Sequence, residues 1–191
     1  MFAGHFGIPA AVKSKTPETP LWSLIVSTQL LDIVFIPFNL VGLENIESIG
    51  DGGYGGYGND MIYAFYTHSL VGSLILSVLA ALLAKKLWGR KSGIITGAVV
   101  FSHWILDFIV HRPDMPILPG NIGNLPLLGL GLWETVPGSV LLEALLLAIG
   151  CFFYFSYALK KEVFAHKGKG IMAGCAMTAF LLLSFYFGIS L

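Results

Sequence analysis

The feature that most constrains this chain is a series of long apolar runs that carry almost no charge. Five runs cover most of the sequence: residues 21–43, 61–84, 92–111, 133–159 and 171–191. A helix needs about 20 apolar residues to cross roughly 30 Å of hydrocarbon. The runs therefore predict an all-α integral membrane bundle of about five transmembrane helices, which forms a single domain over residues 1–191.

Charge is sparse in the chain, and it is balanced. Only 12% of the residues are charged, about half the ~25% of a typical soluble domain, and 11 basic residues match 11 acidic ones. A chain of this composition has no basic face for nucleic acid and is too apolar to stay disordered. We therefore expect membrane lipids as its surroundings and no nucleic-acid partner. The sequence leaves the oligomeric state open.

The basic residues predict how the helices are oriented. Ten of the 11 fall at one end of the predicted bundle, within residues 13–15, 85–91 and 160–169, and only Arg112 falls at the other end. Loops rich in lysine and arginine remain in the cytoplasm. We therefore expect a cytoplasmic N-terminus and an external, glycine-rich loop at residues 44–60.

The N-terminal segment MFAGHFGIPAA is apolar but too short to cross a membrane. Two arrangements are open for it: an interfacial segment, or a half-helix that re-enters the membrane. In the second arrangement His5 would rise about 12 Å from the inner face and approach the middle of the bundle.

The ionisable residues that would be most costly within the predicted spans are Asp32, His68, His103, Asp107, His111 and Glu143. A charged carboxylate near a helix centre costs ~2.5–3.5 kcal/mol, and no lysine or arginine lies within a span to neutralise the three acids. At 1.5 Å per residue, all of them except His111, which lies at a helix end, are between the outer surface and roughly the midplane. Residues 103, 107 and 111 are four apart and share one helix face. Histidines and carboxylates at a common depth predict a divalent metal site, with zinc favoured.

Each of these residues also has a simpler interpretation. Asp32 can pair with Gln29 or Thr28. Glu143 can be protonated and bonded to a backbone carbonyl, and His111 can lie at the membrane interface. A single histidine in a membrane helix is often only a packing residue with a hydrogen bond. The clustering of histidines and acids is what favours the metal site over these separate explanations.

Several blocks of the chain resemble one known family: MFAGHFG, QLLDIVF, YTHSL, SHWILDFIVHRPDMPILPG and GLGLWETVP. The family comprises bacterial membrane-bound metal-dependent hydrolases, similar to LexA-regulated inner-membrane proteins and often labelled permeases. It is distantly similar to the zinc-dependent phospholipase C and single-strand nuclease superfamily. That superfamily has an all-helical fold that binds a zinc cluster through histidine and aspartate.

The resemblance implies metal-binding roles for particular residues. In chain order, the ligands of the superfamily's central zinc correspond to Asp32, His68, His103 and Asp107. His5 and His111 correspond to ligands of further metals. The superfamily's second His–Glu pair is incomplete here, because Ser139 stands four residues before Glu143. One or two metals are therefore expected rather than three.

The expected function is that of a metal-dependent hydrolase in the bacterial inner membrane, acting on a lipid or lipid-linked phosphoester. Glu143 or Asp107 would act as the general base, and Arg112 would bind a phosphate. The sequence does not establish that the protein is an enzyme. The alternatives are a small transporter or permease that conducts protons or metal, a bis-histidine haem protein, and an assembly subunit whose polar cluster is structural.

Overall fold

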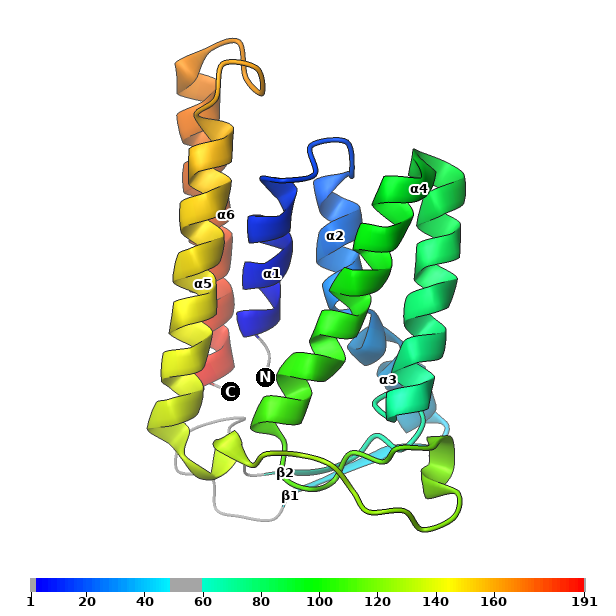
Figure 1. The fold of residues 1–191 in the computed structure, drawn as a ribbon. Coiled ribbons are helices and arrows are strands. Elements are labelled where there is room, and N and C mark those ends of the chain that lie inside the picture. Colours follow the sequence, from blue (N-terminus) through cyan, green and yellow to red (C-terminus); the bar gives the residue numbers. More distant parts are fainter. Residues whose placement is uncertain (1–2, 49–59, 191) are drawn as a thin grey trace.

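The structure is a computed structural model that describes residues 3–48 and 60–190, and most of these residues are helical (Figure 1). Its helices are α1 (Gly4–Lys13), α2 (Leu21–Thr28), α3 (Leu30–Leu40), α4 (Leu70–Val110), α5 (Val136–Ala158) and α6 (Lys167–Ser190). Strands β1 (Asn45–Ser48) and β2 (Asp60–Tyr63) form a hairpin, and η1 (Pro119–Asn121) and η2 (Leu132–Glu134) are short 3₁₀ turns. Most of the predicted glycine-rich loop, residues 49–59, lies outside the described residues.

The helix α4 consists of two arms that fold back on each other at Gly89 (Figure 1). Gly89 has a φ of 88° and a ψ of 171°, a conformation that glycine adopts readily. The arms pack closely, because a Cβ added to Gly93 would lie 2.7 Å from the carbonyl oxygen of Ala81. The two arms correspond to the spans predicted at residues 61–84 and 92–111.

The helix boundaries differ from the predicted ones in two places. The first arm begins at Leu70 rather than at residue 61, because Asp60–Tyr63 pairs with β1 and Ser69 caps the helix by accepting a hydrogen bond from the Gly72 amide. The span predicted at residues 21–43 is bent by 49° between α2 and α3. Among the described residues, α4, α5 and α6 are long and apolar enough to cross a membrane, and the bent pair makes a fourth candidate.

The outward faces of the long helices are apolar and exposed. Leu83 on α4 is 60% exposed, Leu141 on α5 is 70% exposed and Leu182 on α6 is 59% exposed. An apolar surface of this extent is unfavourable in water and suits contact with lipid acyl chains. The long apolar helices and their exposed faces together indicate a membrane protein.

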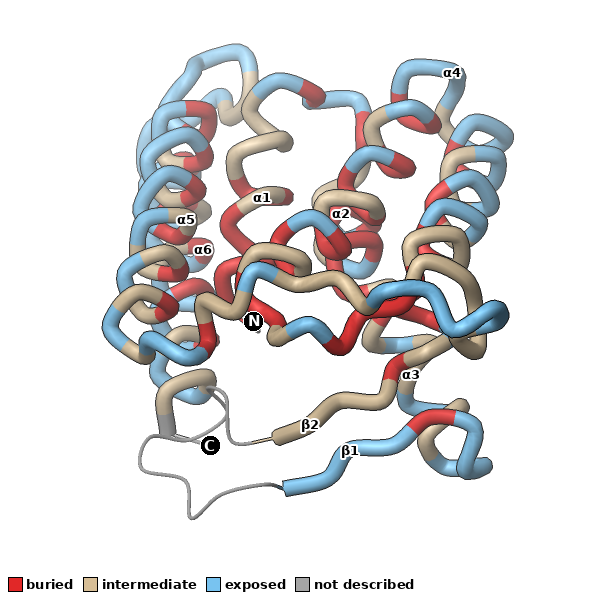
Figure 2. Tube along the Cα trace, turned by 60° about the horizontal axis from the view of Figure 1, so that its bottom comes forward, coloured by how far each residue is buried: buried red, intermediate tan, exposed pale blue. Residues whose placement is uncertain are grey.

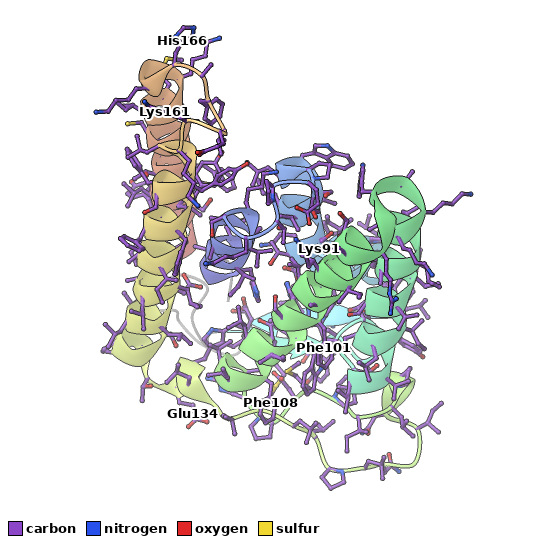
Figure 3. The ribbon with its side chains drawn as sticks, turned by 45° about the horizontal axis from the view of Figure 1, so that its top comes forward. Lys91, Phe101, Phe108, Glu134, Lys161 and His166 are labelled. Carbon is purple, nitrogen blue, oxygen red and sulfur yellow. The ribbon has the colours of Figure 1, made fainter. Side chains whose placement is uncertain are left out.

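The turns that carry ten of the 11 basic residues lie together at one end of the bundle (Figure 1). In Figure 3, Lys161 and His166 lie at this end of the α5–α6 pair, and Glu134 lies at the opposite end. Lys91 Nζ is 2.8 Å from Glu18 Oε1, and this hydrogen bond lowers the pKa of the Glu18 carboxyl. The basic end is thus one continuous region of the folded chain.

The short helix α1 occupies the middle of the bundle, between the α5–α6 pair and α2 with α4 (Figure 1). Most of its residues are buried, His5 among them, and Figure 2 shows buried positions gathered along it. It lies against α5 with almost no space between the backbones. A Cβ added to Gly7 would lie 2.4 Å from the Leu146 carbonyl oxygen, and one added to Gly150 would lie 2.6 Å from the Gly7 carbonyl oxygen.

We expect Gly150→Ala to destabilise the protein by about 1–3 kcal/mol, because the new methyl group meets backbone atoms that cannot move aside. Gly168→Ala is the matched control, since nothing lies within 4 Å of a Cβ at that position. The control should be neutral or slightly stabilising, because alanine favours helix more than glycine does. Thermal unfolding in detergent measures both, and equal midpoints would contradict the close packing of α1 on α5.

Candidate metal centre

Five of the predicted site residues come together from four parts of the chain. Asp32 belongs to α3, His68 to the segment before α4, His103 and Asp107 to the second arm of α4, and His5 to α1. The cluster lies toward the end of the bundle opposite the basic turns, where α1 and the first arm of α4 begin (Figure 1).

Two histidine nitrogens of this cluster lie close to one oxygen of each aspartate. The Nε2 atoms of His68 and His103 are 3.4 Å apart. Asp32 Oδ1 lies 3.3 and 3.5 Å from these two nitrogens, and Asp107 Oδ2 lies 3.5 and 2.9 Å from them. Ligands held ~2.0–2.2 Å from a tetrahedral metal are about 3.3–3.6 Å apart. Four of the five distances fall in that range, and the fifth is shorter.

The hydrogen position on His103 follows from its backbone partner. His103 Nδ1 lies 2.6 Å from the carbonyl oxygen of Thr28, which is free for this contact because α2 ends there. A carbonyl only accepts, so Nδ1 carries the hydrogen and the neutral ring has its lone pair on Nε2. That lone pair faces Asp107 Oδ2 at 2.9 Å. A cation or an additional proton between the two atoms is needed to make the contact favourable.

His5 contacts the other oxygen of Asp107. Its Nε2 lies 3.2 Å from Asp107 Oδ1, and its ring stacks on that of His103 with centroids 3.8 Å apart. Asp32, His68 and His103 form one group of potential ligands, and His5, His103 and Asp107 form a second that shares His103 with it. Since His103 Nε2 can bind one ion only, this geometry favours His5 as the residue that orients the Asp107 carboxylate.

Asp32 has the most exposed side chain of the five cluster residues. The side chains of His5, His103 and Asp107 are at most 3% exposed, whereas that of Asp32 is 43% exposed. Its neighbours Ile33 and Ile36 are exposed as well. The most exposed residue of the cluster therefore lies beside exposed apolar side chains of α3.

Three predicted site residues belong to neither group of potential ligands in the described part of the chain. The His111 ring lies 6.5 Å from that of His68, and its Nδ1 is 3.0 Å from Asp114 Oδ1. Glu143 is fully buried on α5, the helix that packs against α1. Arg112 is half-buried directly after His111.

The sequence prediction missed three residues that support the cluster: Thr28, Glu44 and Thr67. Thr28 also donates its hydroxyl to the His5 carbonyl oxygen at 3.0 Å, and Thr67 Oγ1 lies 2.9 Å from His68 Nδ1. A threonine directly before His68 is a weak sequence signal. No sequence pattern relates Glu44 to Thr67, which lies 23 positions later.

The comparisons with known proteins add no assignment. No protein-family model, no curated protein and no solved structure matches the chain significantly. The site is therefore interpreted from its own geometry.

Proposed function

We propose that this protein is a membrane-embedded metal-dependent hydrolase that binds one divalent ion through Asp32, His68, His103 and Asp107. The observation that carries the proposal is that Asp32 Oδ1 and Asp107 Oδ2 each lie within 3.5 Å of the Nε2 atoms of both His68 and His103. The other nitrogen of His103 is bonded to a carbonyl, as in a metal-binding histidine. Mixed histidine and carboxylate ligands suit zinc. The ion would also neutralise two acids that are costly inside a membrane.

The arrangement in the membrane is part of the proposal. We assign five crossings to the α2–α3 pair, the two arms of α4, α5 and α6, with α1 as a re-entrant half-helix. The shared basic end supports a cytoplasmic side there, which puts the cluster in the outer half of the bilayer. We further propose that the membrane is a bacterial inner membrane. We also propose that the protein belongs to the hydrolase family that its sequence resembles.

Cysteine labelling tests this orientation in a background without Cys151 and Cys175. We expect an impermeant maleimide to label Ser48→Cys on intact cells and to label Lys86→Cys only after permeabilisation, because both positions are exposed and lie at opposite ends. Labelling in the reverse pattern would place the cluster in the inner half of the membrane.

Asp32 is the ligand best placed to open the site. Four protein ligands fill a tetrahedral shell, whereas catalysis needs a position for water or substrate. Asp32 alone is substantially exposed, so its carboxylate has room to move aside. A bound divalent ion would lower the pKa of a water toward ~7 and polarise a phosphoryl oxygen. Glu143 remains our candidate for the general base, and Arg112 for phosphate binding.

The exposed apolar side chains beside Asp32 on α3 support a lipid or lipid-linked phosphoester as the substrate. We expect zinc-loaded protein to release phosphate from diacylglycerol phosphate in mixed micelles faster than from p-nitrophenyl phosphate. His103→Gln should abolish the release, because it removes a ligand that is 1% exposed. Equal rates on both compounds would contradict the lipid preference. Zinc binding without hydrolysis of either would leave a structural metal site, and ion flux in proteoliposomes would then test transport.

A further inference from the structure

Glu44 is a buried acid that contacts the segment before α4 from outside the metal-ligand cluster. It is 2% exposed and lies at the start of the β-hairpin. Its Oε1 accepts from the backbone amides of Tyr66 and Thr67 at 2.7 and 2.8 Å. The Thr67 hydroxyl lies 2.9 Å from Oε2 and 3.1 Å from Oε1. Both carboxylate oxygens are therefore engaged as acceptors.

The Thr67 hydroxyl connects this carboxylate to His68. A hydroxyl has one hydrogen, and an ionised carboxylate can only accept, so the hydrogen points to Glu44. Thr67 Oγ1 must then act as the acceptor toward His68 Nδ1, which lies 2.9 Å away. For His103, a carbonyl that can only accept fixes the hydrogen on Nδ1. A hydroxyl can donate or accept, so Thr67 without Glu44 would leave the His68 ring free to take either tautomer.

We infer that Glu44 is a positioning residue: through Thr67 it keeps the hydrogen of His68 on Nδ1 and leaves the Nε2 lone pair facing the metal position. The consequence for metal binding rests on the proposed function, whereas the tautomer does not. Nε2 is the nitrogen that lies 3.3 Å from Asp32 Oδ1 and 3.5 Å from Asp107 Oδ2. Fixing the second nitrogen in this way is how metal-binding histidines are oriented and made more basic.

Glu44 also connects the two segments that carry Asp32 and His68. Its amide donates to the Phe38 carbonyl oxygen at 3.2 Å, and Asn39 Nδ2 donates to the Glu44 carbonyl oxygen at 3.3 Å. Both partners lie in α3. The backbone of Glu44 thus holds the last turn of that helix while its side chain holds the residues next to His68.

The test uses Glu44→Gln, which keeps the shape and the two hydrogen bonds from backbone amides but reverses the direction of the hydrogen bond to the Thr67 hydroxyl. The glutamine amide would donate to Thr67, whose hydroxyl could then donate to His68 Nδ1 and move the ring hydrogen to Nε2. Imidazole ¹⁵N shifts of the metal-free protein in detergent at pH 8 report the tautomer, and a His68→Gln sample assigns the signal. We expect the tautomer to reverse and the zinc affinity to fall about 10–100-fold.

Two variants of Thr67 make the test independent of whether Glu44→Gln folds. Thr67→Ser keeps the hydroxyl and should behave like the wild type, while Thr67→Val should lose the Nδ1–H preference and the same 10–100-fold in zinc affinity. Identical tautomers and affinities in these two variants would overturn the inference, as would an unchanged tautomer in Glu44→Gln. A tautomer change in a protein that binds no zinc would support the inference and refute the metal proposal. Tight zinc binding that none of these variants alters would refute the inference about Glu44 and support the metal proposal.

Discussion

Asp107→Asn is expected to lower the zinc affinity more than about 100-fold, which exceeds the cost usually seen for a residue that only orients a ligand. The substitution keeps the shape of the side chain but removes its charge. Asp107 is the one residue that contacts all three clustered histidines: Oδ2 lies near His103 and His68, and Oδ1 lies near His5. No other described carboxylate has these contacts.

The same variant should lose stabilisation by zinc. A ligand present at 100 times its Kd stabilises a folded protein by about 2.7 kcal/mol. Zinc should therefore raise the unfolding midpoint of the wild type and leave that of Asp107→Asn unchanged. Element-resolved metal analysis of both purified proteins measures the binding directly.

Asp114→Asn is the matched control for this experiment. Asp114 is also a buried aspartate bonded to a histidine, with its Oδ1 3.0 Å from His111 Nδ1, but it belongs to neither group of potential ligands. It should retain zinc. Equal zinc loss in both variants, or unchanged binding by Asp107→Asn, would refute the proposed coordination.

Helix geometry made part of this cluster predictable. His103 and Asp107 are four residues apart on a long apolar run, so the helix itself brings them together, and the structure has them 2.9 Å apart. All four proposed ligands share one sequence signal: each is an ionisable residue in an apolar run that has no lysine or arginine to pair with it.

The local geometry around Asp32 and His68 could not be predicted from hydropathy. The segment before His68 is apolar and aromatic, and such a pattern suits a strand as well as a helix. Here residues 60–63 pair with β1, and His68 lies in a non-helical connection. The bend at Gln29 has no proline or glycine to mark it, yet it makes the Thr28 carbonyl available to His103.

The position of α1 depends on contacts between residues far apart in the chain. The sequence left its N-terminal segment either interfacial or re-entrant. In the structure Gly7 and Gly150 allow α1 and α5 to touch, and this brings His5 to Asp107. Many glycines are present in the sequence, and no local pattern identifies these two as partners.

Zinc affinity of the wild type is expected to fall between pH 7.5 and pH 5.5, because protons compete with the metal for the two ligating imidazoles. A metal binds only the neutral imidazole, so each proton that His68 or His103 takes up opposes binding. Affinity is thus highest at the upper end of this interval and is lost as the pH falls.

The same titration of His5→Gln shows whether His5 is a ligand. We expect the variant to keep the pH dependence of the wild type, because His5 contacts Asp107 Oδ1 rather than the metal position and a glutamine amide can donate to that oxygen. His166→Gln, at an exposed position in the basic loop, is the control. Competition with a chelating dye at each pH gives the affinities. A pH dependence that is clearly weaker in His5→Gln than in the wild type and in His166→Gln would instead make His5 a third imidazole ligand.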